Sequence, residues 1–138
     1  MQIQTEEHQA KAVGKNMRVS YKETTEIGRF IKGDTVEKAE NKLERVIEKD
    51  LPVPMTKFNS DAGHKSGTGP GKYPVKAAKE MLEKLRSAIS NAENEGLNVN
   101  QLEVQKVVSN QGPKMRTPKR HRGREKKTSH VTIVVGEK

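Results

Sequence analysis

Apolar residues recur every three or four positions in three stretches of the chain, and this spacing predicts three amphipathic helices. The first helix is expected to begin at a capping box at residues 20–23 and to end at Gly33. A second capping box, at residues 34–37, predicts the start of the next helix. The third is expected between Pro74, which suits a first helical turn, and Gly96. The apolar faces that should pack in the core are Ile27, Phe30 and Ile31 in the first helix, Val36, Ala39, Leu43, Val46 and Ile47 in the second, and Val75, Ala78, Leu82, Leu85, Ile89 and Ala92 in the third.

Two stretches rich in β-branched residues, 102–108 and 131–135, have the composition of strands. Residues 12–19 are expected to pair at a sheet edge. The segment between the two β-branched stretches is long and basic, so we predict an extended hairpin over residues 110–129. At about 3.3 Å per residue, its arms would project at most about 30 Å beyond the sheet. Because this segment has almost no large apolar side chain, we expect it to be ordered only when it is bound to a partner.

These elements predict an α+β fold, with three helices packed on a small antiparallel sheet and a protruding basic β-hairpin. The length suits a single domain over residues 1–138. Residues 50–74 are rich in Pro and Gly and are expected to form an irregular insertion loop, which either binds a partner or is disordered. The chain has no cysteine, which excludes disulfides and fits a reducing compartment. We expect neither a signal peptide nor a membrane span.

The charge of the chain is concentrated in one window. Residues 112–127 contain eight Lys or Arg and one Glu, and so carry +7 of the total charge of +9. Like charges at this density repel one another and need an anionic partner. Phosphate backbones suit this window best, because cations that neutralise phosphates release counterions and arginine binds phosphate oxygens in pairs. The alternative is a solvated basic loop or a localisation signal, but the position between two predicted strands favours a binding arm.

Candidate catalytic and metal-binding patterns fail on spacing. The stretch 67–72 resembles a phosphate-binding loop, but Ser66 occupies the first glycine position and Tyr73 follows Lys72. The four histidines are scattered, without the spacing of a metal site. Ser129 and His130 are neighbours on a predicted strand, so their side chains should point to opposite faces. We therefore expect no enzymatic activity, no catalytic or metal site and no cofactor.

Six short motifs occur in an order that is similar to one known family. They are RFIKG followed by VEKA (29–33 and 36–39), LRSAISNA (85–92), GL (96–97), GPKM (112–115), RGR (122–124) and TSH (128–130). Through them the chain resembles the universal ribosomal protein L22 family of the large ribosomal subunit, over roughly residues 18–135. Residues 53–76 look like the insertion of the archaeal and eukaryotic branch. With three residues between Arg124 and Thr128, the hairpin is shorter than is usual in that family.

The resemblance implies a cytoplasmic structural component of the large subunit. Its α+β body would bind the large ribosomal RNA near the tunnel exit and contact neighbouring ribosomal proteins. Its hairpin would reach the wall of the exit tunnel, where the nascent chain passes. The alternative from another class is a free-standing, non-specific RNA-binding protein or RNA chaperone, which would use the same arm outside any particle.

The expected RNA contacts follow from charge. In the arm, the expected phosphate contacts are Lys114, Arg116, Lys119, Arg120, Arg122, Arg124, Lys126 and Lys127. Gly112 and Gly123 would give the backbone room to turn or to pass close to RNA. His121 would stack on a base or face the tunnel, with an exposed imidazole as the alternative. On the body, the secondary candidates are Lys15, Arg18, Lys22, Lys65 and Lys72, which look like ordinary surface lysines and arginines in the sequence. Charge and shape, rather than base sequence, would be recognised.

Overall fold

The computed structural model describes residues 8–59, 62–116 and 125–137. In these residues it contains three α-helices and several short antiparallel sheets, so the predicted α+β class is confirmed. The elements in chain order are β1 (Gln9–Met17), α1 (Tyr21–Ile31), α2 (Val36–Ile47), β2 (Val53–Pro54), β3 (Gly63–Lys65), β4 (Gly69–Lys72), α3 (Val75–Asn94), a 3-10 turn (Val99–Gln101), β5 (Leu102–Gln111), β6 (Met115–Arg116), β7 (Glu125–Lys126) and β8 (Ser129–Glu137).

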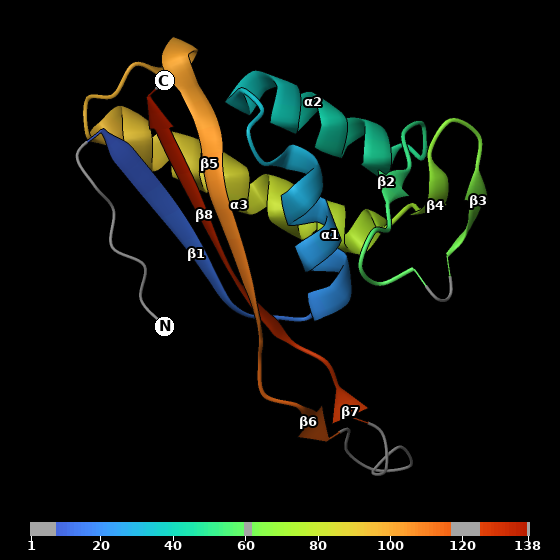
Figure 1. Cartoon of the computed structure of the whole chain (residues 1–138). Helices are drawn as coiled ribbons and strands as arrows, with labels where there is room; N and C mark the ends of the chain where they lie inside the picture. The colour runs from blue at the N-terminus through green and yellow to red at the C-terminus, as the bar shows by residue number, and fades with distance from the viewer. Residues whose placement is uncertain (1–7, 60–61, 117–124, 138) are drawn as a thin grey trace.

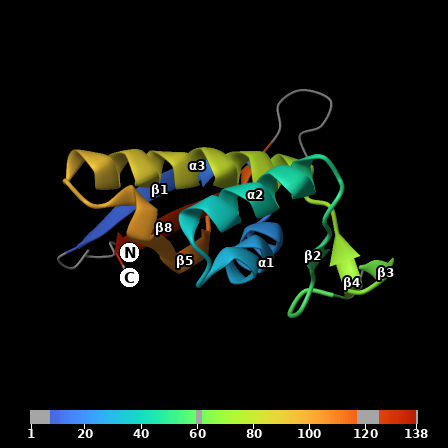
Figure 2. The same ribbon diagram turned by 90° about the horizontal axis from the view of Figure 1, so that it is seen from above.

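The main sheet has the strand order β1-β8-β5, and both pairings are antiparallel. Figure 1 shows α3 lying along the sheet, with α1 and α2 on the same side of it. In Figure 2 the helices and the sheet form separate layers, and α2 packs beside α3. Helix α1 approaches β5 closely at Gly28, where a Cβ atom would lie 2.9 Å from Cγ1 of Val107. The missing side chain at this position therefore sets the distance between helix and sheet.

The core lies between the helices and the main sheet, and most of the predicted apolar faces are buried in it. Phe30, Ile47 and Ile89 are only partly buried against it, and Val75, at the start of α3, is partly exposed. The buried face of α3 is wider than the spacing of large apolar residues predicts, because Ala77, Met81 and Ala88 are also fully buried. The reason is that α3 packs against α2 and also against β1 and β8, so it contacts the core over a broader arc.

Both predicted glycine stops are confirmed. Gly33 and Gly96 have φ angles of +86° and +82°, in the left-handed region. The capping box at residues 20–23 predicts the start of α1 correctly, because Ser20 is its N-cap. The predicted capping hydrogen bond is absent, because the side chain of Ser20 accepts no hydrogen bond from the helix.

Helix α2 begins one residue later than the capping box at residues 34–37 predicts. Its N-cap is Thr35, whose side chain accepts a hydrogen bond from the backbone N–H of Lys38 at 3.3 Å. The backbone carbonyl of Asp34 instead accepts from the N–H of Val104 in β5. The carboxylate of Asp34 pairs with Nζ of Lys42 at 2.6 Å. The backbone carbonyl of Asp34 is thus bonded to β5, and the N-cap of α2 is the next residue, Thr35.

The predicted irregular segment at residues 50–74 contains regular structure that the sequence did not indicate. Strands β2, β4 and β3 form a second antiparallel sheet in that order. Its strands are short and contain Gly and Pro, which are depleted in strands, so their composition resembles that of turns. Figure 1 shows this small sheet beyond the ends of α1 and α2.

A buried carboxylate ties this segment to α1. The side chain of Glu26 is 1% exposed and accepts hydrogen bonds from the backbone N–H groups of Thr56 and Lys57, at 2.7 and 3.1 Å. The hydroxyl of Thr56 donates a further bond at 3.1 Å. Burial by itself raises the pKa of Glu26, but these hydrogen bonds and the charge of Arg29 outweigh it and hold the pKa below the ordinary value of 4.5. The carboxylate therefore stabilises the fold above that value, and the contribution is lost as the pH falls through the lowered pKa.

We expect Glu26→Gln to lower the free energy of unfolding by about 1–3 kcal/mol at pH 7, because the amide has one acceptor oxygen in place of two. The difference from the wild type should shrink at pH 3, because the unfolded chain binds a proton below its ordinary pKa of 4.5 and the stabilisation that comes from the lowered pKa is then progressively lost. Urea unfolding of both proteins at the two pH values measures this, with exposed Glu37→Gln as the matched control. An equal loss at both pH values would contradict the role of the carboxylate.

The pairing of the two predicted β-branched strands is confirmed, because β5 pairs with β8 from Leu102↔Glu137 to Gln111↔Ser129. Beyond the main sheet, β6 pairs with β7. Figure 1 shows β6 and β7 past the end of the body. Residues 117–124 lie outside the described part of the chain, so the extended basic hairpin remains a prediction over that stretch.

Candidate nucleic-acid interface

The base of the cationic window is held by contacts between its two strands. The backbone N–H of Gly112 donates to the carbonyl of Thr128 at 2.9 Å, and the hydroxyl of Thr128 donates to the carbonyl of Pro113 at 2.6 Å. A Cβ atom at Gly112 would lie 3.2 Å from the backbone carbon of Thr128. The space left by the missing side chain of Gly112 is thus occupied by Thr128, which lies between β7 and β8.

Several predicted contact residues follow this base. Lys114 and Lys127 are exposed, and Lys126 is partly buried in β7 opposite Met115. The backbone of Arg116 pairs with that of Glu125 in β6 and β7. The remaining arm candidates lie outside the described residues: Lys119, Arg120, His121, Arg122, Gly123 and Arg124.

The structure brings four of the predicted lysines together around the first turn of α1. Lys22, Lys114 and Lys127 line an open cavity of about 160 Å³. Lys22 and Lys72 line a second cavity of about 190 Å³. The two cavities share Ser20 and Lys22, so they lie side by side.

The other three body candidates lie elsewhere. Lys15 is exposed on β1, and Arg18 is exposed just after that strand. Lys65 lies on β3, with Nζ 5.6 Å from the ring centroid of Tyr73. None of the three lines either cavity at the start of α1.

Sequence reasoning missed Lys57 and Phe58 in the second cavity. Nζ of Lys57 lies 5.5 Å from the ring centroid of Phe58, and Nζ of Lys22 lies 5.7 Å from it. Both residues belong to the segment without periodic pattern, and no local signal distinguishes them from other loop residues. Their position depends on the hydrogen bonds that the backbone N–H groups of Thr56 and Lys57 donate to Glu26. These bonds join residues that are far apart in the sequence.

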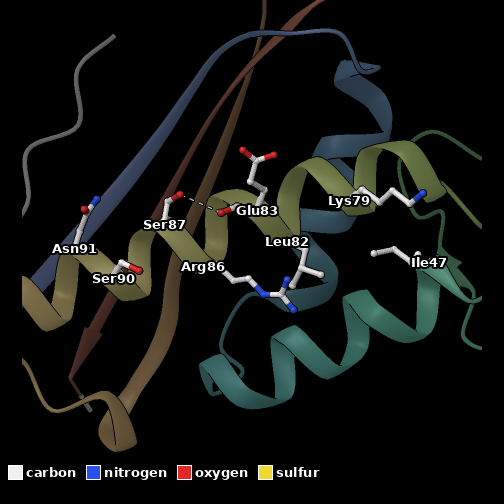
Figure 3. Close-up of a pocket in the computed structure, with 8 residues that line it drawn as sticks. All are labelled: Ile47, Lys79, Leu82, Glu83, Arg86, Ser87, Ser90 and Asn91. Carbon is white, nitrogen blue, oxygen red and sulfur yellow. Dashed lines mark hydrogen bonds between the residues drawn. The ribbon is translucent and has the colours of Figure 1, made fainter.

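A larger pocket lies between α3 and α2, but its side chains do not form a catalytic arrangement. In Figure 3, Arg86 points from α3 toward α2, where it pairs with Glu44 at 3.0 Å. Ser87 donates its hydroxyl hydrogen bond to the backbone carbonyl of Glu83 rather than to a base. An exposed ion pair of this kind contributes about 0–1 kcal/mol to stability.

The pair Ser129 and His130 behaves as its strand position predicts. Ser129 is fully buried, whereas His130 is partly exposed and its Nδ1 accepts a hydrogen bond from the backbone N–H of Asn16 at 3.1 Å. Among the described residues, no group of three His, Cys, Asp or Glu could hold a metal ion. In the same part of the chain, every helix is too short or too polar to cross a bilayer.

Comparisons with known proteins agree on one family. The family model described as ribosomal protein L22p/L17e matches residues 12–136. The large ribosomal subunit protein uL22 of Methanosphaera stadtmanae is 40% identical, over 99% of this chain and 94% of that protein. The protein of the same name from Thermofilum pendens is 40% identical over 80% of this chain and 74% of its own length. That of Haloarcula marismortui is 40% identical, with 78% of this chain and 74% of the relative covered.

Proposed function

The chain belongs to the ribosomal protein L22p/L17e family, and from this premise we propose that it is a structural component of the large ribosomal subunit in the cytoplasm. The family consists of structural, non-enzymatic ribosomal proteins. The relatives compared above are archaeal, which supports an archaeal-type protein. In this role residues 1–138 act as one ribosomal-protein domain, with the large-subunit RNA and neighbouring ribosomal proteins as its partners.

The observation that carries the proposal is the cationic window, which is attached to two paired strands of the main sheet. Residues 112–127 carry +7, and the strands on either side of the window, β5 and β8, are paired from end to end with one bulge between Val104 and Lys106. A charged segment with so few apolar side chains gains little by packing on itself, whereas RNA phosphates neutralise it. We infer that the window binds ribosomal RNA, supports assembly of the subunit, and contributes with its tip to the wall of the peptide exit tunnel, where it would meet the nascent chain.

Sedimentation tests the proposal directly. A tagged copy expressed in its native cells should migrate with the large subunit through a high-salt sucrose gradient, because RNA encloses its cationic segment. A copy that stays at the top of the gradient would contradict the ribosomal role and favour a free RNA-binding protein, whose attachment is lost as salt rises.

A further inference from the structure

Helix α1 lies along strand β5 and contacts it at two levels on the way to the cationic window. Near the middle of the helix, Gly28 lies against the side chain of Val107. At the first turn, the hydroxyl of Ser109 donates a hydrogen bond to Oγ1 of Thr24 at 2.9 Å. Residues four apart share a helix face and residues two apart share a strand face, so both contacts join the same two surfaces. Figure 1 shows this first turn at the end of the body from which β6 and β7 extend.

The contact of Ser109 belongs to a short chain of hydroxyl hydrogen bonds. Thr24 is fully buried, and its Oγ1 accepts from Ser109 and donates to the backbone carbonyl of Tyr21 at 3.0 Å. Each hydroxyl has one hydrogen to donate, so both groups have a defined partner. Strand β5 ends two residues later, at Gln111. The chain of bonds therefore fixes β5 to the helix just before the strand leaves the body.

The second strand of the hairpin is attached to β1 at the same level. Asn110 of β5 pairs with His130 of β8, and Nδ1 of His130 accepts a hydrogen bond from the backbone N–H of Asn16 at 3.1 Å. Asn16 has a φ angle of +54° and lies where the pairing of β1 with β8 shifts register. The imidazole thus supplies an acceptor at an irregular position of the sheet edge.

The two attachments lie on opposite faces of the main sheet. Ser109 pairs with Val131, which is buried in the core, so the side chain of Ser109 lies on the face that the helices cover. His130 precedes Val131 along β8, and its side chain therefore points to the other face. One attachment opposes a swing of the hairpin away from α1, and the other opposes a swing away from β1.

We propose that Thr24 and His130 are positioning residues, which fix the direction in which the cationic window leaves the body. A two-stranded hairpin is at most marginally stable alone, so its direction depends on where the body holds it. A fixed direction removes part of the ordering cost of binding in advance. The inference rests on the proposed function, because a window that already points in one direction suits a partner whose binding site is fixed, as in a large ribosomal subunit.

The distance between two spin labels measures this direction in the isolated full-length chain. The chain has no cysteine, so Ser90→Cys on α3 and Arg116→Cys on β6 provide two unique labelling sites. Arg116 lies seven residues beyond Ser109. This separation is at most about 23 Å along a strand, so a swing of about 20° moves the label by up to about 8 Å.

We expect one narrow distance distribution when the two attachments are intact. The double variant Thr24→Val, His130→Phe keeps side chains of similar shape but removes the hydroxyl and the imidazole acceptor. Its distribution should be broader by several Å. If the double variant does not fold, Thr24→Val and His130→Phe are measured singly, and each should broaden the distribution. A broad distribution in the wild type, or equal widths in the wild type and these variants, would overturn the inference.

Two further variants separate positioning from stability. The conservative variant Thr24→Ser, His130→Asn retains a hydroxyl and an acceptor, and it should restore the narrow distribution. Val46→Ala shortens a fully buried side chain of α2, so it should lower the unfolding midpoint but leave the distribution narrow. Equal broadening by Val46→Ala would show that the loss of stability, rather than the loss of the attachments, releases the hairpin.

The consequence for binding is measured with tagged, unlabelled chains in the sucrose gradient. The double variant keeps all eight Lys and Arg residues of the cationic window. If about a third of its hairpins point in the binding direction, its apparent affinity falls about threefold, and so does its share of large subunits in competition with the wild type. A broader distribution with an unchanged share would also contradict the inference, because direction would then not matter for binding. Failure of the proposed function is recognised separately: the wild type then stays out of the large subunit, whatever the label distances are.

Discussion

Replacing Arg120, Arg122 and Arg124 together with Glu should weaken binding to large-subunit RNA by at least about a hundredfold and block incorporation into large subunits. Each charge-assisted hydrogen bond contributes about 1.5–3 kcal/mol, so three lost contacts correspond to more than two orders of magnitude. The change also reduces the charge of residues 112–127 from +7 to about +1, which removes most of the attraction to phosphates. Quantifying the tagged variant in gradient fractions of large subunits measures the effect.

The control for this reversal must change net charge by the same amount elsewhere. Replacing Lys32, Lys49 and Lys79 with Glu does so at exposed positions outside the cationic window. This control variant should enter large subunits as the wild type does, if the position of the charges rather than the net charge of the protein decides binding. The reversed variant should also keep the unfolding midpoint of the wild type, because the three arginines lie between β6 and β7 in the sequence and arginine is rarely a core residue. Normal incorporation of a folded reversed variant would refute the assignment of the cationic window.

Leu85→Ala should lower the free energy of unfolding by about 2–5 kcal/mol. Leu85 is fully buried near the middle of α3, the helix that packs against α2 and against two strands of the main sheet. Removing its side chain loses the transfer free energy of the buried methyl groups and leaves a cavity that the packed helices and sheet cannot easily close. Since domains are stable by about 5–15 kcal/mol, and since only 30% of this chain is hydrophobic, the loss is a large share of the total.

Urea unfolding at pH 7 measures this loss, and two variants serve as its controls. Leu85→Met keeps most of the volume and should cost less than about 1.5 kcal/mol. Ser90→Ala, at an exposed position of the same helix, should change stability by less than about 0.5 kcal/mol. A cost for Leu85→Ala no greater than that of Ser90→Ala would show that α3 is not central to the core.

Periodicity made the helices predictable, because their burial follows directly from the spacing of apolar residues. Leu43 and Leu85 are fully buried as that spacing indicates. Local turn chemistry was reliable where one residue decides it, as at Gly33. It failed where a distant strand competes, since the backbone of Asp34 pairs with Val104 and leaves the cap to Thr35.

The small sheet and the cavities at α1 could not be predicted for a related reason. Both depend on contacts between residues far apart in the sequence. One example is Glu26, which accepts hydrogen bonds from residues about thirty positions away, and an isolated Glu in a helix carries no sign of such a partner. The cationic window was conspicuous because its charge is contiguous in the sequence. The lysines around Ser20 are far apart in the sequence, so their common location appears only in three dimensions.

The position of β8 has a consequence for the order of events during synthesis. This strand is central in the main sheet, between β1 and β5, yet it follows both of them in the sequence. Until residues 129–137 are made, β1 and β5 have no sheet partner, and the apolar faces of the helices have no complete surface to cover. The cationic window at residues 112–127 therefore leaves the synthesising ribosome before the body can close. A chain of this design is able to meet RNA by charge first and to complete its hydrophobic core afterwards.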